Sequence, residues 1–470
     1  MIMKKLHSKS PDSYLFTKED FHLCELTQTF GVSNVWLEKG MQNQIATYDL
    51  MIRDMPKNRS FFVASGLEEL VSHVLRTRYS KKDIAYLLKL KIITPKFAKY
   101  LRKFKFSGDI WAMPEGTIFF PGEPVVRITG PIIEGNMLTI LLINSVVSNT
   151  IFTSKLIRPL IAAKGKQVIG PAMLRAQSFE SGMKASRAAY ICGLAQNLMN
   201  LHQKYQLKQQ PPMAYAYHAF IKSFDHEIDA MRAITDIFPA VYLMVDTYDF
   251  DEGLKNAIQV AKELEMRGEK LAGITIDSGD LVALSKKVRR ELDRHDLQYV
   301  KISVASNLDE HKIVKMMRRG IAADSFLCAT EMITVTDEPK LEAIFKLAEI
   351  RDGKTIKHMA KLTPGKLSLP GLKQVYRIYD KKGKFKKDII GLENEKNGGV
   401  PLLLPIIRKG KIVYKFPTLD EIAAQVKNQV QKLPEVLLDV TKTNPYKVEI
   451  SRSILKTLGE LRKKHQSHNG

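Results

Sequence analysis

Six short apolar runs recur along the middle of the chain, with helix-like stretches between them, and they constrain the fold more than any other feature. They are 166–169, 213–217, 240–245, 271–276, 300–305 and 321–328. From 213 onward, the starts are separated by 27, 31 and 29 residues. A strand, a helix and their two loops need about 30 residues, so this spacing predicts parallel β/α units.

The flanking segments have a different pattern, and 470 residues exceed the usual size of one domain. We expect an N-terminal α+β domain over 1–130, the β/α segment with the active site over 131–345, and a β-rich extension over 346–470 that partly returns to the first domain. The expected helices are 67–77, 80–90 and 134–164, with a further helical stretch at 221–234 that contains His226. Expected strands outside the β/α segment are 45–52, 116–121, 371–379 and 411–416.

The chain carries a formal net charge of +23, which is often a sign of polyanionic partners. Residues 351–470 contain 26 basic and 11 acidic side chains, so most of the excess lies in the last quarter. Its densest run, 381–387, is typical of a basic turn between two strands. A solvated surface explains the run better than a nucleic-acid site, because no finger, RNP or heptad pattern accompanies it.

Cys24, Cys192 and Cys328 are too few to form a disulfide framework, and this usage suits a reducing compartment. The N-terminus has no secretory pattern, and the longest apolar stretches, such as 137–147, are shorter than a membrane span. We therefore expect a cytoplasmic protein that does not enter membranes.

Polar residues follow the predicted strands at the points where these end. Asp246 and Asp249 follow one run, Asp277 and Asp280 follow the next, and Ser306-Asn307 follow the third. Parallel strands place these ends at one edge of the sheet, where carboxylates can orient ribose hydroxyls, hold hydrated magnesium or stabilise a cation. The alternative is that such residues cap the following helices.

Arg175 and His218 follow two further runs. A guanidinium at a strand end can bind a phosphate or a carboxylate in a bidentate manner. An imidazole there can act as a nucleophile, a base or a phosphoryl acceptor, although a hydrogen-bonded structural histidine is the alternative.

These strand-end motifs resemble, in sequence and in order, those of the nicotinate phosphoribosyltransferases. The matching pieces lie between about residue 20 and residue 380. They include SGLEEL from Ser65, PGEPVVRITGP from Pro121, Arg175-Ala176-Gln177, His218-Ala219-Phe220, VDTYD ending at Asp249, IDSGDL from Ile276, VASN ending at Asn307 and LPGLKQVYR ending at Arg377.

The resemblance implies an irregular α/β barrel of the type II phosphoribosyltransferase kind. It also implies that nicotinate and phosphoribosyl pyrophosphate give nicotinate mononucleotide and pyrophosphate, with magnesium and with ATP hydrolysis coupled through a phosphorylated His218. A homodimer with its site at the subunit interface is implied as well. The implied catalytic residues are His218, Asp277 and Asp280, and the implied substrate-binding residues are Arg175, Gln177, Asp246, Asp249, Ser278, Gly279, Ser306, Asn307 and Thr330.

The chain departs from the family pattern at several ligand-contacting places. The first of two arginines is replaced by Leu174, and the arginine before the DSGD motif is replaced by Thr275. A glycine-rich phosphate loop reads Leu327-Cys328-Ala329-Thr330. Close approach of backbone N–H groups to a phosphate favours glycine, so these changes are expected to weaken anion binding. Further departures are Cys24 in place of an aromatic, Pro171-Ala172, a turn around Gln196 to Met199, and Tyr215-Ala216.

Three functions remain open from the sequence. The chain is a divergent nicotinate phosphoribosyltransferase, a non-catalytic descendant that binds a protein or nucleotide, or a phosphoribosyltransferase for another base. We further hypothesise that Lys155, Lys184 or Lys222 replaces the lost positive charge.

Overall fold

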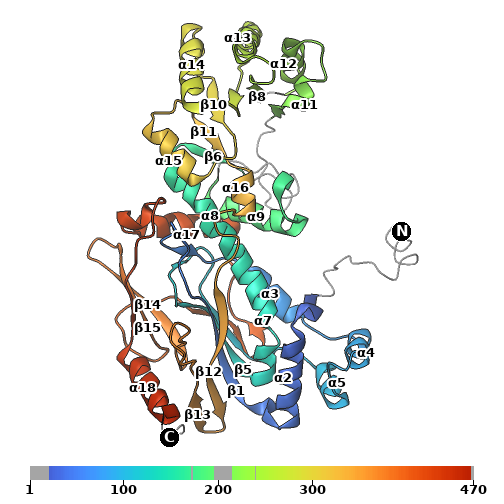
Figure 1. Ribbon diagram of the computed structural model, residues 1–470, viewed down its shortest axis with the longest axis vertical. Helices are drawn as coiled ribbons and strands as arrows, with labels where there is room; N and C mark the ends of the chain where they lie inside the picture. Colours follow the sequence, from blue (N-terminus) through green and yellow to red (C-terminus); the bar gives the residue numbers. More distant parts are fainter. Residues whose placement is uncertain (1–20, 171–172, 195–213, 239, 467–470) are drawn as a thin grey trace.

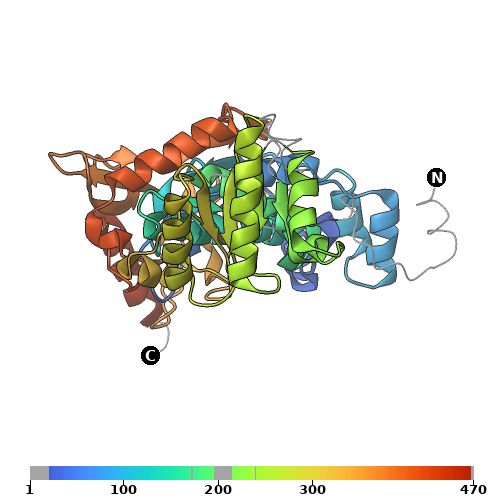
Figure 2. The same ribbon diagram turned by 90° about the horizontal axis from the view of Figure 1, so that it is seen from above.

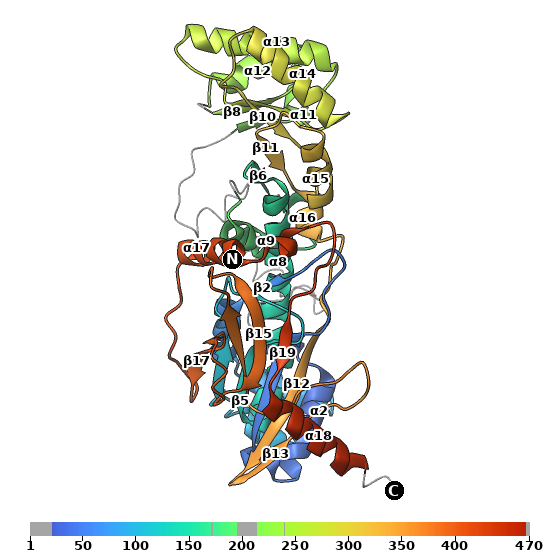
Figure 3. The ribbon, with the colours of Figure 1, turned by 90° about the vertical axis from the view of Figure 1, so that its left-hand side faces the viewer.

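The computed structural model of the protein describes residues 21–170, 173–194, 214–238 and 240–466. The molecule is elongated (Figures 1 and 3). A parallel sheet and its helices form the upper part of Figure 1, mainly antiparallel sheets form the lower part, and helix α8 (Ser148–Ala162) runs between them. In the end-on view, the helices α4 and α5 (blue) and the C-terminal segments (red) lie at opposite sides of the molecule (Figure 2).

The upper part contains a six-stranded parallel sheet in the order β6-β11-β10-β9-β8-β7. Every predicted run supplies one of its strands, so the β/α prediction is confirmed. In the described residues the edge strands β6 and β7 do not pair with each other, so the sheet is open at this point. The strands are β6 (Gln167–Ile169), β7 (Ala214–Ala216), β8 (Val241–Met244), β9 (Gly273–Ile276), β10 (Lys301–Val304) and β11 (Ser325–Leu327).

Amphipathic helices follow the strands and cover one side of this sheet, as Figure 3 shows for α12 to α14. Helix α13, for example, buries Leu254, Ala257, Ala261 and Leu264 along one stripe. The helices are α9 (Phe179–Cys192), α11 (His218–Ile221), α12 (Glu227–Thr235), α13 (Phe250–Met266), α14 (Leu281–Arg294), α15 (Glu310–Arg318) and α16 (Thr330–Thr334). The expected single helix over 221–234 is wrong, because His226 is the N-cap residue of α12 rather than an interior residue.

The lower part is a seven-stranded sheet that combines strands from both ends of the chain, in the order β13-β12-β1-β5-β3-β17-β18. Strand β1 pairs antiparallel with β5 on one side and with β12 on the other. The strands are β1 (Ile45–Ile52), β3 (Asp109–Ala112), β5 (Pro124–Pro131), β12 (Ala343–Asp352), β13 (Thr355–His358), β17 (Leu404–Arg408) and β18 (Lys411–Ile412). A two-stranded sheet adds β2 (Phe62–Val63) and β4 (Ile118–Phe119), and helices α2 (Thr27–Glu38), α3 (Leu67–Arg76), α4 (Lys81–Lys89) and α5 (Pro95–Leu101) accompany them.

A four-stranded sheet and two helices complete the C-terminal segment. The basic run 381–387 covers the turn between β14 and β15, as predicted, together with the first residues of β15. Lys384 Nζ donates a hydrogen bond to the Gln431 carbonyl oxygen at the C-terminal end of α17, where positive charge is favourable. The elements are β14 (Lys373–Tyr379), β15 (Phe385–Leu392), β16 (Val400–Pro401), β19 (Val448–Ile450), α17 (Leu419–Lys432) and α18 (Arg452–Gln466).

The long apolar helix expected over 134–164 is broken into α6 (Ile132–Asn136), α7 (Thr139–Leu142), the π-helical turn η3 (Ile143–Val147) and α8. Residues 139–162 form 24 helical residues that are apolar enough to span a membrane, so the expectation that no apolar stretch has this length is wrong. However, 72% of the most apolar window of this helix is buried inside the protein. The segment therefore has the burial of a core helix.

Buried charges connect α8 to the rest of the molecule. Lys155 Nζ lies 2.9 Å from Glu310 Oε2 and 2.8 Å from Asp337 Oδ1, and Arg158 Nε lies 2.6 Å from Glu310 Oε1. Arg59 Nη2 pairs with Asp337 Oδ2 at 2.9 Å. Glu310 is fully buried, and its two cationic neighbours offset the cost of removing its charge from water.

A second buried cluster joins the N-terminal and C-terminal segments. Arg377 binds the Asp388 carboxylate through Nε and Nη2, and Tyr446 donates a hydrogen bond to the same carboxylate. Glu123 is buried against Asp388, and one of its carboxyl oxygens has no hydrogen-bond donor within the described ranges. Burial first, and then the Asp388 charge, raises the pKa of Glu123 well above its usual range, which favours the protonated carboxyl.

We expect the substitution Glu310→Gln to lower the free energy of unfolding by about 3 kcal/mol, because Lys155 and Arg158 lose a buried counter-charge. Urea denaturation measures this change. Glu449→Gln is the matched control, since Glu449 forms only partly exposed pairs with Lys387 and Lys447. Equal effects of the two substitutions would contradict the role assigned to the buried network.

The Glu123 carboxyl predicts a pH dependence of stability. Its pKa is raised by folding, so its contribution is complete below the ordinary carboxyl pKa and is lost as pH rises through the raised value. We expect the stability of the wild type, measured from the ordinary carboxyl pKa of about 4.3 upward, to fall more steeply with pH than that of Glu123→Gln. Parallel curves would show that Glu123 is already ionised in the folded protein.

Candidate functional site

Three ionisable side chains meet at the carboxyl ends of β7, β8 and β9. His218, Asp246 and Asp277 follow these neighbouring parallel strands, and their potential ligand atoms all lie within 4.8 Å of one another. The three side chains are half-buried. The expectation that these strand-end residues converge is therefore confirmed by geometry for this group.

His218 is held on both sides of its imidazole ring. Its Nδ1 lies 3.0 Å from the Thr247 hydroxyl oxygen, and its Nε2 lies 3.4 Å from Asp277 Oδ2. A carboxylate beside Nε2 favours a proton on that nitrogen, which leaves the Nδ1 lone pair as the nucleophilic position. The Thr247 hydroxyl can then donate to Nδ1 and fix the ring plane.

Asp246 and Asp277 are adjacent acids. Asp246 Oδ2 accepts hydrogen bonds from the Asp277 N–H at 2.9 Å and from the Ser278 hydroxyl at 2.7 Å. Burial and then the Asp246 charge raise the pKa of Asp277, while His218 acts in the opposite direction. Two acids this close favour a cationic ligand, which would relieve their repulsion.

The donor set fits a magnesium ion. Asp246 Oδ1 is buried and has no hydrogen-bond partner among the residues that the structure describes, and Asp277 offers a second carboxylate close by. Magnesium prefers oxygen ligands and keeps several waters, so the two aspartates suit it and the imidazole nitrogen does not. Asp246 and Asp277 are therefore the residues that would hold the ion.

The other two aspartates of the strand-end motifs cap helices. Asp249 accepts from the N–H groups of Asp251 and Glu252 at the start of α13. Asp280 caps α14 in the same way and also pairs with Arg319 at 2.7 Å, a hydrogen bond that lowers its pKa. The capping alternative accounts for both side chains.

Ser278, Gly279, Ser306 and Asn307 form the turns beside the acids. Gly279 has φ +74°, a conformation that favours glycine. Ser306 and Asn307 also have positive φ, at 98° and 45°, although neither is glycine. Two such residues in succession at the end of β10 indicate local backbone strain next to the site.

Arg175, Gln177 and Thr330 lie at the opposite end of the strand order, beyond β6 and β11. Gln177 Nε2 donates to the Thr334 carbonyl oxygen at 3.4 Å, which links η4 (Met173–Arg175) to α16, the helix that Thr330 begins. Arg175 is exposed and forms no ion pair within the described ranges. In the described part of the chain, these residues form no hydrogen bond or ion pair with His218, Asp246 or Asp277.

Part of the backbone of the altered phosphate loop, residues 327–330, is hydrogen-bonded within the sheet. The Cys328 N–H donates to the Ile169 carbonyl oxygen at 2.8 Å, so it is not available to an anion. A Cβ on Gly170 would lie 2.2 Å from the Cys328 carbonyl oxygen, so glycine is required on the facing loop. Two other departures, at Pro171-Ala172 and around Gln196 to Met199, lie outside the described residues.

Two of the three lysines considered as replacement charges are already engaged. Lys155 belongs to the buried network with Glu310, and Lys184 pairs with Glu69 at 2.9 Å. Lys222 is exposed at the C-terminal end of α11. These contacts leave Lys155 and Lys184 without a free ammonium group for a substrate.

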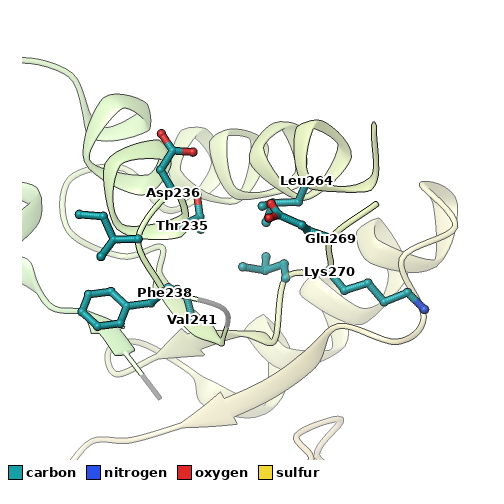
Figure 4. A pocket seen from close by; sticks show the side chains of 9 residues that line it. Thr235, Asp236, Phe238, Val241, Leu264, Glu269 and Lys270 are labelled. Carbon is teal, nitrogen blue, oxygen red and sulfur yellow. The ribbon is translucent and has the colours of Figure 1, made fainter. Parts of the chain in front are cut away.

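A separate pocket of about 300 Å³ lies at the amino-terminal edge of the sheet (Figure 4). Val241, Leu264 and Leu271 supply apolar surface. Two acids on its rim, Asp236 and Glu269, both pair with Arg267. The carboxyl-end acids do not line this pocket, so we do not assign the strand-end chemistry to it.

Sequence reasoning missed Thr247 as a site residue, although it stands directly after Asp246. It named Thr275 only as a replaced arginine, and it missed Ser303 and Ser325; all three are buried hydroxyl residues of β9, β10 and β11. The sequence does contain a sign of them, one hydroxyl residue in each of three successive apolar runs. A search for polar residues at the strand ends overlooks it, because these hydroxyls lie inside the strands.

Known families and structures match most of the chain. Residues 28–147 match the N-terminal domain of nicotinate phosphoribosyltransferase and residues 399–458 match its C-terminal domain. The human nicotinic acid phosphoribosyltransferase structure aligns with TM-score 0.80 at 21% identity, covering 93% of this chain and 99% of that one. A nicotinate-nucleotide pyrophosphorylase from Pyrococcus furiosus aligns with TM-score 0.71 at 22% identity, covering 90% and 99%. Both support the type II phosphoribosyltransferase fold.

The relatives found by sequence have a higher identity to this chain than these two structures have. Nicotinate phosphoribosyltransferase pncB2 of Mycobacterium tuberculosis is 34% identical over 432 residues, which cover 91% of this chain and 90% of that protein. The Bacillus subtilis nicotinate phosphoribosyltransferase is 28% identical over 476 residues, covering 94% of each. With this extent of similarity, the chain belongs to the nicotinate phosphoribosyltransferase family.

Proposed function

We propose that the protein transfers the phosphoribosyl group of phosphoribosyl pyrophosphate to the ring nitrogen of a pyridine base, as in NAD salvage. Nicotinate is the base that the names of its relatives state. The convergence of His218, Asp246 and Asp277 at one sheet edge carries this proposal. The direct test is to incubate the protein with phosphoribosyl pyrophosphate and a pyridine base, with and without ATP, and to look for the mononucleotide and pyrophosphate.

The reaction breaks the bond between ribose C1 and the pyrophosphate oxygen and forms a bond from C1 to the ring nitrogen. Positive charge develops on the sugar as pyrophosphate leaves, as in glycoside cleavage. The Asp277 and Asp246 carboxylates are placed to stabilise this charge and to orient the ribose hydroxyls. Magnesium, when bound, neutralises the leaving pyrophosphate.

His218 is the candidate phosphoryl acceptor for ATP. Attack of Nδ1 on the γ-phosphorus would form a nitrogen–phosphorus bond and release ADP, and water would later cleave that bond to give phosphate. Asp277 beside Nε2 would stabilise the imidazolium character of the phosphorylated ring. The ring orientation set by Thr247 and Asp277 supports this role.

We also propose a homodimer in the cytoplasm. Leu174 and Phe179 are 81% and 83% exposed beside η4, and Tyr217 and Tyr248 are 61% and 66% exposed at the carboxyl ends of β7 and β8. Apolar side chains this exposed near a candidate site favour coverage by a second subunit.

A catalytically impaired member that binds a partner or nucleotide is the second candidate. The observation in its favour is the Cys328 N–H, which is bound within the sheet rather than free for a phosphate. Absence of mononucleotide with any pyridine base would favour this candidate.

We expect His218→Ala to abolish the stimulation of mononucleotide synthesis by ATP and to leave some ATP-independent turnover. The reason is that the phosphoryl acceptor is lost while Asp246 and Asp277 remain. Rates with and without ATP measure the effect, and His226→Ala is the control because His226 is an N-cap residue outside the group of three. Full ATP coupling in His218→Ala would exclude the assigned role.

Asp277 and Asp280 should differ sharply. We expect Asp277→Asn to reduce kcat/KM about 100-fold, because it removes a charge from the sugar-facing group. Asp280→Asn should reduce it far less, since Asp280 caps α14 and pairs with Arg319. Steady-state kinetics of both variants decides the matter, and a larger loss from Asp280→Asn would reverse the assignment.

A further inference from the structure

Three hydroxyl side chains form a row across adjacent strands of the parallel sheet. Ser303 of β10 stands in register with Thr275 of β9 on one side and with Ser325 of β11 on the other. Residues in register on neighbouring parallel strands point to the same face of the sheet. The three hydroxyls therefore belong to one surface.

The three hydroxyls lie on the same face of the sheet as Asp246 and Asp277. Thr275 precedes Asp277 by two residues, so it lies on the same face about 6.6 Å deeper. Two residues further from the carboxyl edge, the Tyr242 ring stacks on the Tyr215 ring with centroids 5.5 Å apart. The same ring covers Gly273, the residue that pairs with Tyr242 on β9. From the edge inward, the face presents acids, then hydroxyls, then tyrosine rings.

The hydroxyls are buried and unpaired. Thr275, Ser303 and Ser325 are 2%, 0% and 1% exposed, and none of their oxygen atoms has a hydrogen-bond partner among the described residues. A buried hydroxyl without a partner costs about 1 to 3 kcal/mol, so three in one row indicate that a polar group of a ligand or water occupies this place. Met244, in register with Thr275, is half-buried and is flexible enough to move aside.

The row is electrically neutral. No lysine or arginine of the described chain forms a hydrogen bond to these hydroxyls, Arg175 is exposed beyond the far edge of the sheet, and Lys155 and Lys184 are engaged elsewhere. A buried carboxylate needs a cationic partner, whereas a carboxamide needs only one acceptor and one donor. A hydroxyl supplies both of these.

We propose that the acceptor base of this site is an uncharged heterocycle bearing a carboxamide, whose amide group binds Thr275, Ser303 and Ser325. This inference rests on the proposed phosphoribosyl transfer and names the class of its acceptor. The ring of the base lies between the acids and the hydroxyls. Its nitrogen faces the sugar at Asp277, and its amide group reaches the hydroxyls. An anionic base such as nicotinate meets no compensating charge in this row.

The experiment compares nicotinamide and nicotinate as acceptors, with phosphoribosyl pyrophosphate, magnesium and ATP present. We expect kcat/KM for nicotinamide to exceed that for nicotinate at least about tenfold, equivalent to about 1.4 kcal/mol. Thr275→Arg places a cation in the row and should shift the ratio toward nicotinate by a similar factor. Ser303→Ala should lower kcat/KM for nicotinamide more than it lowers that for nicotinate.

Ser285→Ala is the matched control. Ser285 is a buried hydroxyl of α14 that donates to the Val282 carbonyl oxygen and accepts from the Ala322 N–H, so its loss should leave the ratio between the bases unchanged. Nicotinate used as well as or better than nicotinamide by the wild type would overturn the inference and leave the proposed phosphoribosyl transfer intact.

If neither base gives a nucleotide, the proposed function fails, and calorimetric titration of the protein with each base alone then tests the row separately. Binding of nicotinamide that is weakened by Ser303→Ala, without comparable binding of nicotinate, would support the neutral row. Equal binding of both bases, or binding of neither, would overturn it.

Discussion

The in-register parallel pairing of β8 with β9 is the constraint on which the candidate site depends. It sets Met244 beside Thr275, so the residues two positions further along, Asp246 and Asp277, stand side by side at the sheet edge. The pairing of β7 with β8 then brings His218 to the same place. A slip of one residue would turn one of the acids to the opposite face. The chemistry is therefore a consequence of register rather than of any single loop.

One buried ionic cluster attaches this sheet to the lower part of the molecule, and a second joins segments within that lower part. The contacts of Lys155 and Arg158 with Glu310 tie the central helix α8 to α15, which follows the strand next to β9. The pair of Arg377 with Asp388, with Glu123 against it, ties the C-terminal sheet to the N-terminal strands. Buried charges of this kind depend on precise geometry, so they restrict how the joined segments can shift relative to each other.

Periodicity and spacing were enough to predict the parallel sheet, because each strand is a short apolar run bounded by polar residues. They also placed His218, Asp246 and Asp277 at one edge, since parallel strands end together. They did not separate the aspartates that meet at the sheet edge from those that cap helices: Asp249 and Asp280 have the same sequence context as Asp246 and Asp277, and only the hydrogen bonds to the α13 and α14 N–H groups distinguish them. The hydroxyl row was equally hidden, because its neutrality depends on which cations lie nearby in space.

The family pattern and this chain differ mainly where anions are expected to bind, while Asp246 and Asp277 remain together at the sheet edge. A crystal structure with phosphoribosyl pyrophosphate and magnesium tests this account most directly. The account predicts the ribose between Asp246 and Asp277, with C1 open toward the face that carries Thr275. A ribose bound elsewhere, or carboxylates of Asp246 and Asp277 that turn away from a bound sugar, would contradict it.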